Sequence, residues 1–128
     1  MRISQGVVAS EERGPTFSGQ VWADPVLGAQ DGVFVNNVFF EPGSRTHWHR
    51  HEVGQVFHVT VGHGWVQTRA GHGEPLACGD TVHIPAGEEH WHGARPDACM
   101  SHLAISIGET QWLDPVSDAD YAGAFAVR

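Results

Sequence analysis

The chain has 128 residues, of which 41% are hydrophobic and 17% are charged. A chain of this length and composition is typical of one globular domain, so we expect residues 1–128 to fold as a single unit. The formal net charge of −8 argues against nucleic acids and anionic membrane surfaces as partners, because both would repel the protein.

The sequence carries no pattern typical of secretion or membrane insertion. Residues 1–15 contain no apolar run suited to a signal peptide, and no segment approaches the roughly 18 apolar residues of a membrane span. Cys78 and Cys99 are the two cysteines, and they are far apart in the sequence. We therefore expect reduced thiols in a cytoplasmic protein.

Glycines and prolines are spread along the chain, which is typical of short strands joined by turns. Turns are predicted at 52–54, 62–64 and 85–87, so that 65–68 would fold back on 55–61 as a hairpin. The pattern predicts an all-β barrel or sandwich with a core over about 32–107 and a short N-capped helix near Ser117. The expected strands or extended segments are 32–40, 46–51, 55–61, 65–68, 80–84, 88–92 and 100–107.

Three of the ten histidines fall in a pattern that indicates a metal site. His49 and His51 are two residues apart, so both imidazoles point to the same face of a strand. Gln55 lies just past a turn, where it can face the same space, and His90 follows the turn at 85–87. Three imidazole nitrogens and one amide oxygen suit Mn²⁺, Fe²⁺, Co²⁺, Ni²⁺ or Zn²⁺, with positions left for water or substrate.

These residues also carry a resemblance to the cupin family. The segment 43–62 is similar to the first cupin motif, with His49-x-His51 followed by a ligand position at Gln55. The segment 79–90 is similar to the second motif, with Pro-x-Gly at 85–87 followed by His90. The resemblance implies a jelly-roll barrel, also called a double-stranded β-helix. It covers both motifs in order and with the right spacing, which is far more specific than a lone His-x-His pair.

Two positions depart from the usual cupin pattern. Gln55 stands where the family usually has a glutamate, and Ala94 stands where it usually has an asparagine that is not a ligand. A neutral ligand in place of a carboxylate leaves the site one charge more positive, which makes a bound ion a stronger Lewis acid.

Almost the whole chain resembles the small bacterial manganese-dependent cupin hydroxynitrile lyases. The matching features include Phe40-Glu41-Pro42-Gly43, Trp48-His49-x-His51, Gly54-Gln55, Gly64-Trp65, Glu88-x-His90-Trp91-His92-Gly93 and Trp112-Leu113-x-Pro115. This resemblance implies that Gln55 is a metal ligand beside His49, His51 and His90, with Mn²⁺ as the expected ion. Glu89 stands where relatives tend to have a lysine, and His47 where many have a small residue.

The same resemblance implies a lyase that cleaves or forms cyanohydrins. It places His92 and His102 in the lining of the pocket, where either could accept the proton of a substrate hydroxyl. The competing interpretation is that both are buried histidines that hold the barrel together.

Two other function classes remain open. The ligands also fit Fe²⁺, so one is a dioxygenase-type oxidoreductase that acts on a small organic substrate. The other is a non-catalytic small-molecule-binding domain, which the many titratable groups expected in the pocket disfavour. A small molecule is the partner in all three. The resemblance also implies a homodimer or homotetramer, in which residues 33–40 could form a contact strand that covers a sheet edge.

The remaining histidines and tryptophans have more ordinary explanations. His58 alternates with Gln55 and should point away from the metal, and His63 and His72 lie in glycine-rich turns at the surface. Core or interface positions are expected for Trp48, Trp65, Trp91 and Trp112.

Overall fold

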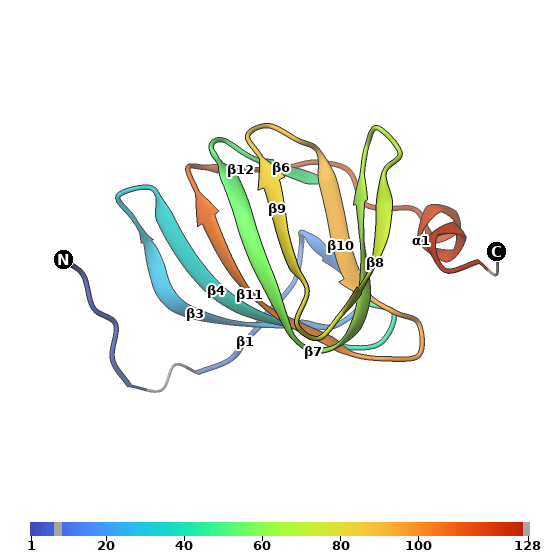
Figure 1. Cartoon of the computed structure of the whole chain (residues 1–128). Coiled ribbons are helices and arrows are strands. Elements are labelled where there is room, and N and C mark those ends of the chain that lie inside the picture. Colours follow the sequence, from blue (N-terminus) through green and yellow to red (C-terminus); the bar gives the residue numbers. More distant parts are fainter. Residues whose placement is uncertain (7–8, 127–128) are drawn as a thin grey trace.

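A computed structural model describes residues 1–6 and 9–126, and it shows antiparallel strands wrapped into a nearly closed barrel (Figure 1). This confirms the predicted all-β fold with a short C-terminal helix. The elements are β1 (Glu11–Arg13), β2 (Phe17–Ser18), β3 (Val21–Gln30), β4 (Val33–Phe40), β5 (Arg45–Thr46), β6 (His49–His51), β7 (Gly54–Thr68), β8 (Gly73–Ala77), β9 (Thr81–Pro85), β10 (His90–Ala94), β11 (Met100–Ile107), β12 (Thr110–Trp112) and α1 (Asp118–Ala124).

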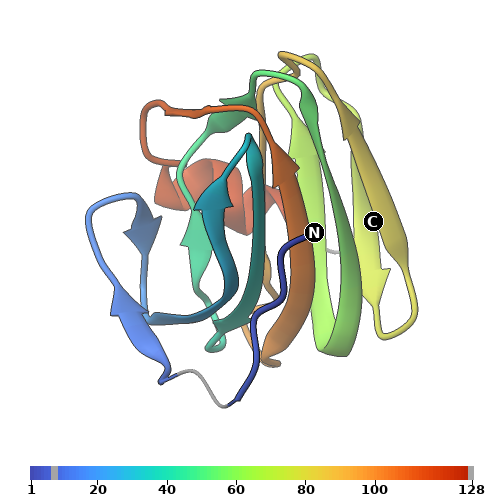
Figure 2. The same cartoon turned by 90° about the vertical axis from the view of Figure 1, so that its left-hand side faces the viewer.

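The barrel has two walls that share the long strand β7. The first wall runs in the order β1, β3, β4, β11, β7 and β9. In the second wall, β10 pairs with β5, β6 and β7, and β7 also pairs with β8. Figure 2 shows the β3–β4 hairpin on the near side of the barrel and α1 on the far side. The two walls enclose the core between them.

The predicted turn at 62–64 is wrong, because β7 runs without interruption from Gly54 to Thr68. Its first half pairs with β11 and β9, and its second half pairs with β10 and β8. At Gly62 the backbone has φ +82°, and an added Cβ would overlap the carbonyl oxygen of Cys99. The glycine marks a corner where one strand passes between walls, rather than the reversal of a hairpin.

The first wall also includes strands that precede residue 32, where the pattern placed the first strand, because β3 pairs along β4. Pro25 and Gly28 interrupt the apolar pattern of β3, and the pairing register shifts between Asp24 and Leu27. As a result β4 lies between β3 and β11. Residues 33–40, the expected contact strand, therefore do not lie at an edge of the sheet.

Two clusters of buried side chains stabilise the fold. The larger one lies between the walls and includes Phe40, Phe57 and Met100. The smaller one lies between the second wall and α1, and it contains three of the predicted core tryptophans. Its members are Trp48, Trp65, Trp91, Val116 and Tyr121.

Helix α1 is anchored to the outside of the second wall. The Ser117 side chain caps its first turn by accepting a hydrogen bond from the backbone N–H of Asp120, as predicted. The Tyr121 hydroxyl donates to the carbonyl oxygen of Ala94 over 2.6 Å, and the Arg45 guanidinium lies 4.5 Å from the centre of the Tyr121 ring. The helix thus supports β5 and β10 from behind. Among the described residues, no helix has the length and apolar character needed to cross a membrane.

The corner at Gly62 generates a stability prediction. Gly62→Ala should lower the free energy of unfolding by at least about 2 kcal/mol more than Gly79→Ala, as measured by urea denaturation. Gly79 is a matched control, since it has φ +96° but nothing within 4 Å of an added Cβ. Equal losses in the two variants would show that the close approach to Cys99 does not constrain the fold.

Candidate metal centre

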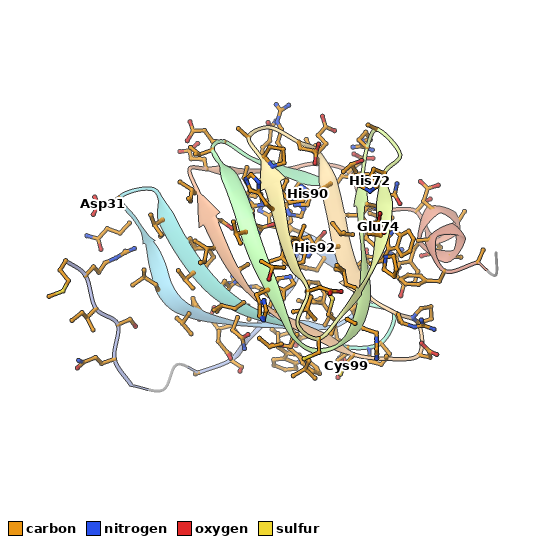
Figure 3. The ribbon with its side chains drawn as sticks, in the orientation of Figure 1. Asp31, His72, Glu74, His90, His92 and Cys99 are labelled. Carbon is orange, nitrogen blue, oxygen red and sulfur yellow. The ribbon has the colours of Figure 1, made fainter. Side chains whose placement is uncertain are left out.

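Three buried histidines meet inside the barrel. His49 and His51 occupy the two ends of β6, with their side chains on the same side of the strand, and His90 begins β10 directly opposite His49. The potential ligand atoms of these three residues all lie within 4.8 Å of one another. Figure 3 shows His90 and His92 on β10 and inside the barrel. The pairing of β6 with β10 therefore brings together residues about 40 positions apart in the chain.

Each of the three imidazoles is oriented through its Nδ1 atom. The Nδ1–H of His49 donates to the carbonyl oxygen of His47 over 2.9 Å, and that of His90 donates to the carbonyl oxygen of Glu88 over 2.9 Å. The Nδ1 atom of His51 lies 3.0 Å from the Thr110 hydroxyl oxygen. The contacts of His49 and His90 with carbonyl oxygens leave their Nε2 lone pairs available, and Nε2 of His51 is buried with no hydrogen-bond partner. Such an arrangement is typical of histidines that ligate a metal.

Burial keeps these histidines uncharged near neutral pH. Desolvation lowers the pKa of His51 and of His90 to about 4, and it lowers the pKa of His49 well below its usual value. Only the neutral imidazole can donate a lone pair to a cation, so the cluster is already in the form that a metal requires.

Gln55 joins the cluster from the other wall. Its Nε2 group donates to the Ser106 hydroxyl over 3.1 Å, which directs its Oε1 atom to within 3.3 Å of Nε2 of His90. Because the proton of His90 is on Nδ1, both facing atoms present lone pairs to each other. A cation that attracts both atoms would relieve this contact, so the donor set fits a divalent metal ion.

His92 and His102 form a second, deeper pair. Nε2 of His102 lies 3.1 Å from Nδ1 of His92, while Nδ1 of His102 and Nε2 of His92 are buried without partners. Whichever ring donates, the two outer nitrogens of the pair comprise one N–H and one lone pair. Burial lowers the pKa of His102 to about 4 and that of His92 well below its usual value. The pair is therefore neutral, and His92 connects it to the cluster with a ring centroid 5.3 Å from that of His49.

A cavity of about 80 Å³ connects the two groups of histidines. His49, His51, Gln55, His92 and His102 all line it. This volume has room for several water molecules or one small organic molecule. A larger open groove of about 480 Å³ lies between β8 and β9, but none of these residues lines it.

The rest of the cavity lining is largely aromatic and aliphatic. Trp112 differs from the buried Trp48, Trp65 and Trp91, because it is 39% exposed and its ring centroid lies 4.6 Å from that of His49. Asn36 also lines the cavity, although the sequence patterns did not indicate it. The signal that could have found it is its alternation with Phe34 and Val38 on β4, which places all three on the inward face.

The other histidines and Glu89 lie outside the cavity. His58 is exposed and contacts the Thr81 hydroxyl over 2.7 Å, which confirms that it points away from Gln55. His63 and His72 are exposed, as predicted. The Glu89 carboxylate pairs with Arg69 over 3.1 Å at the surface. The acidic residue beside His90 is therefore not directed at the histidine cluster.

Comparisons with known proteins agree with this architecture. Residues 36–106 match the cupin domain family, and the chain is 43% identical to an (R)-mandelonitrile lyase of Granulicella tundricola over 94% of its length and 98% of the relative. A cupin-like protein of Thermotoga maritima superposes with a TM-score of 0.85 at 36% identity, covering 94% of this chain and 97% of that one. A polyketide cyclase of Streptomyces resistomycificus shares the fold alone, with a TM-score of 0.71 at 22% identity, over 94% and 89% of the two chains. The chain belongs to the cupin family.

Proposed function

We propose that this protein is a metal-dependent lyase that cleaves or forms small cyanohydrins. The proposal rests on one observation, which is that two groups of side chains meet at the same cavity. The first group is the His49–His51–His90 cluster with Gln55, and the second is the His92–His102 pair. The likeness to the (R)-mandelonitrile lyase, which extends over 94% of the chain, supports this reaction class.

In this proposal, His49, His51, His90 and Gln55 hold one divalent ion, with Mn²⁺ as the proposed metal. When bound, the ion would supply Lewis-acid stabilisation of negative charge on a substrate oxygen. The four ligands are all neutral, so none of them offsets the positive charge of the ion. Ser106 is a positioning residue, because its hydroxyl accepts a hydrogen bond from the Gln55 amide and so holds that side chain beside the histidines.

The His92–His102 pair can accept one proton and donate another, as the reaction requires. Cleavage removes the hydroxyl proton of the cyanohydrin, the C–C bond breaks with its electron pair going to cyanide, and cyanide takes up a proton. The lone pair at one outer nitrogen accepts the first proton, and the N–H at the other supplies the second. The reverse sequence forms a cyanohydrin from hydrogen cyanide and an aldehyde.

The second candidate is an oxidoreductase that uses Fe²⁺ at the same ligands. It is favoured by the donor set alone, because three imidazoles and a neutral oxygen bind Fe²⁺ as well as Mn²⁺. Oxygen consumption by the iron-loaded protein, together with no cyanide release by the manganese-loaded protein, would favour this candidate.

We also propose that a second copy of the chain covers the outer face of the first wall, as in a homodimer or homotetramer. Leu103, Ile105 and Ile107 are 38%, 39% and 40% exposed along β11, and Val56 is 38% exposed on the neighbouring strand β7. Ile105 lies directly between Val35 and Val56 in the pairing register. A contiguous aliphatic surface of this kind is typical of an interface between proteins.

The metal ligands are tested by metal analysis after dialysis. The purified protein should retain one divalent ion per chain, and His51→Ala should lose it. Ser106→Ala should weaken the affinity roughly tenfold, because Gln55 loses the group that orients it. His58→Ala is the control, since His58 is exposed on the opposite face of β7. Full retention by His51→Ala, or no binding by the unaltered protein, would contradict the site.

The role of the deeper pair is tested by cyanide release from mandelonitrile. His102→Ala should keep its metal and lose at least about 100-fold in kcat, because the proton-accepting group is gone. His83→Ala, which alters an exposed histidine on β9, should match the unaltered enzyme. Normal turnover by His102→Ala would remove this residue from the mechanism.

The interface is tested by light scattering coupled to gel filtration. Ile105→Glu should shift the protein to the monomer, because association would bury an unpaired carboxylate. Val61→Glu places the same charge at another exposed position of β7 nearer the corner, and it should disturb association less. An unchanged oligomer in Ile105→Glu, or a monomeric unaltered protein, would refute this interface.

A further inference from the structure

One polar side chain in the cavity has no part in the proposed proton transfer or metal binding. Asn36 lies on the inward face of β4, with Phe34 and Val38 as its neighbours on that face. Its Oδ1 atom is buried and has no hydrogen-bond partner. An amide oxygen in this state is unfavourable compared with one that is hydrated, so the residue requires an explanation.

The residues that flank Asn36 on its own face, and the residue directly opposite it, offer no hydrogen-bond donor. Its cross-strand neighbour on β11 is Ala104, whose methyl group offers no donor and occupies little space. Phe34 and Val38 are apolar as well. A molecule within the cavity, which Asn36 and Ala104 both line, would be placed to supply this donor.

Asn36 also stands on a different wall from the histidine cluster. His49, His51 and His90 belong to β6 and β10 in the second wall, whereas Asn36 belongs to β4 in the first. His102, two residues before Ala104 on β11, completes the inward surface beside it. A small molecule whose reacting group faces the histidines would present its remaining substituent to Asn36.

We propose that Asn36 is a specificity-determining residue that accepts a hydrogen bond from a hydroxyl group on the substrate's substituent. The proposal rests on the proposed lyase function and narrows its substrate class. The preferred substrates are short, hydroxyl-bearing aldehydes and their cyanohydrins, rather than apolar compounds of the same size. The cavity volume of about 80 Å³ is consistent with a short substituent.

The first test compares two aldehydes with the same number of heavy atoms. Glycolaldehyde carries a hydroxyl where propanal carries a methyl group, and both can be supplied with cyanide to the manganese-loaded protein. We expect kcat/KM to favour glycolaldehyde by about tenfold, the effect of one hydrogen bond to a buried acceptor. Asn36→Leu, which is similar in size but apolar, should reduce this ratio to one or below without loss of bound metal.

Asn37→Leu is the matched control. Asn37 is the next residue on β4 and alternates to the outer face, where it pairs with Asp24 and Leu103. The ratio should stay at its original value in this variant. A tenfold preference that persists in Asn36→Leu, or the absence of any preference in the unaltered protein, would overturn the proposal.

A binding measurement separates this inference from the proposed reaction. Titration calorimetry with hydroxyacetone and butanone, again a hydroxyl and methyl pair, needs no turnover. Tighter binding of hydroxyacetone that is lost in Asn36→Leu, in a protein that releases no cyanide, would refute the lyase and retain the specificity residue. Equal binding of both ketones by a protein that does release cyanide would refute the role of Asn36 and retain the lyase.

Discussion

The close approach of Gly62 to the backbone at Cys99 determines how the two walls of the barrel meet. Both halves of β7 contribute to the site, because Gln55 lies near its start and Thr68, at its end, pairs with His90. One continuous strand thus fixes a ligand of the first wall relative to the ligands of the second. A strand that reversed at this point could not join the walls, and the amide of Gln55 would not face the imidazoles.

The second constraint is electrostatic. Five histidines are buried within one small region, and all of them are held in the neutral form by desolvation. Neutral rings do not repel one another as charged rings would, but their lone pairs face other lone pairs. An example is the contact between Nε2 of His90 and Oε1 of Gln55. A cation that binds only the folded chain would relieve this conflict and would also stabilise the fold through mass action. The polar interior is thus consistent with a protein that is completed by its metal.

Much of the site could be predicted, because it depends on short-range geometry. The spacing of His49 and His51 fixes their common face on any strand, and the motif around His90 supplies the third imidazole. The long-range features were harder to foresee. The Gly62–Gly64 segment has the composition of a tight turn, and only the nearby backbone at Cys99 shows that the glycine serves a corner. Asn36 was missed because an amide within a valine- and phenylalanine-rich strand gives no sign of what it faces until the cavity is known.

The position of Trp112 has an optical consequence. Its indole lies against His49 at the edge of the cavity, whereas Trp48, Trp65 and Trp91 are buried beside the helix. Intrinsic fluorescence therefore contains one component from the site itself, beside components from these three tryptophans and from Trp22 on β3. A paramagnetic ion beside His49 would quench the emission of Trp112, so the chain carries its own emission probe for the occupancy of the cavity.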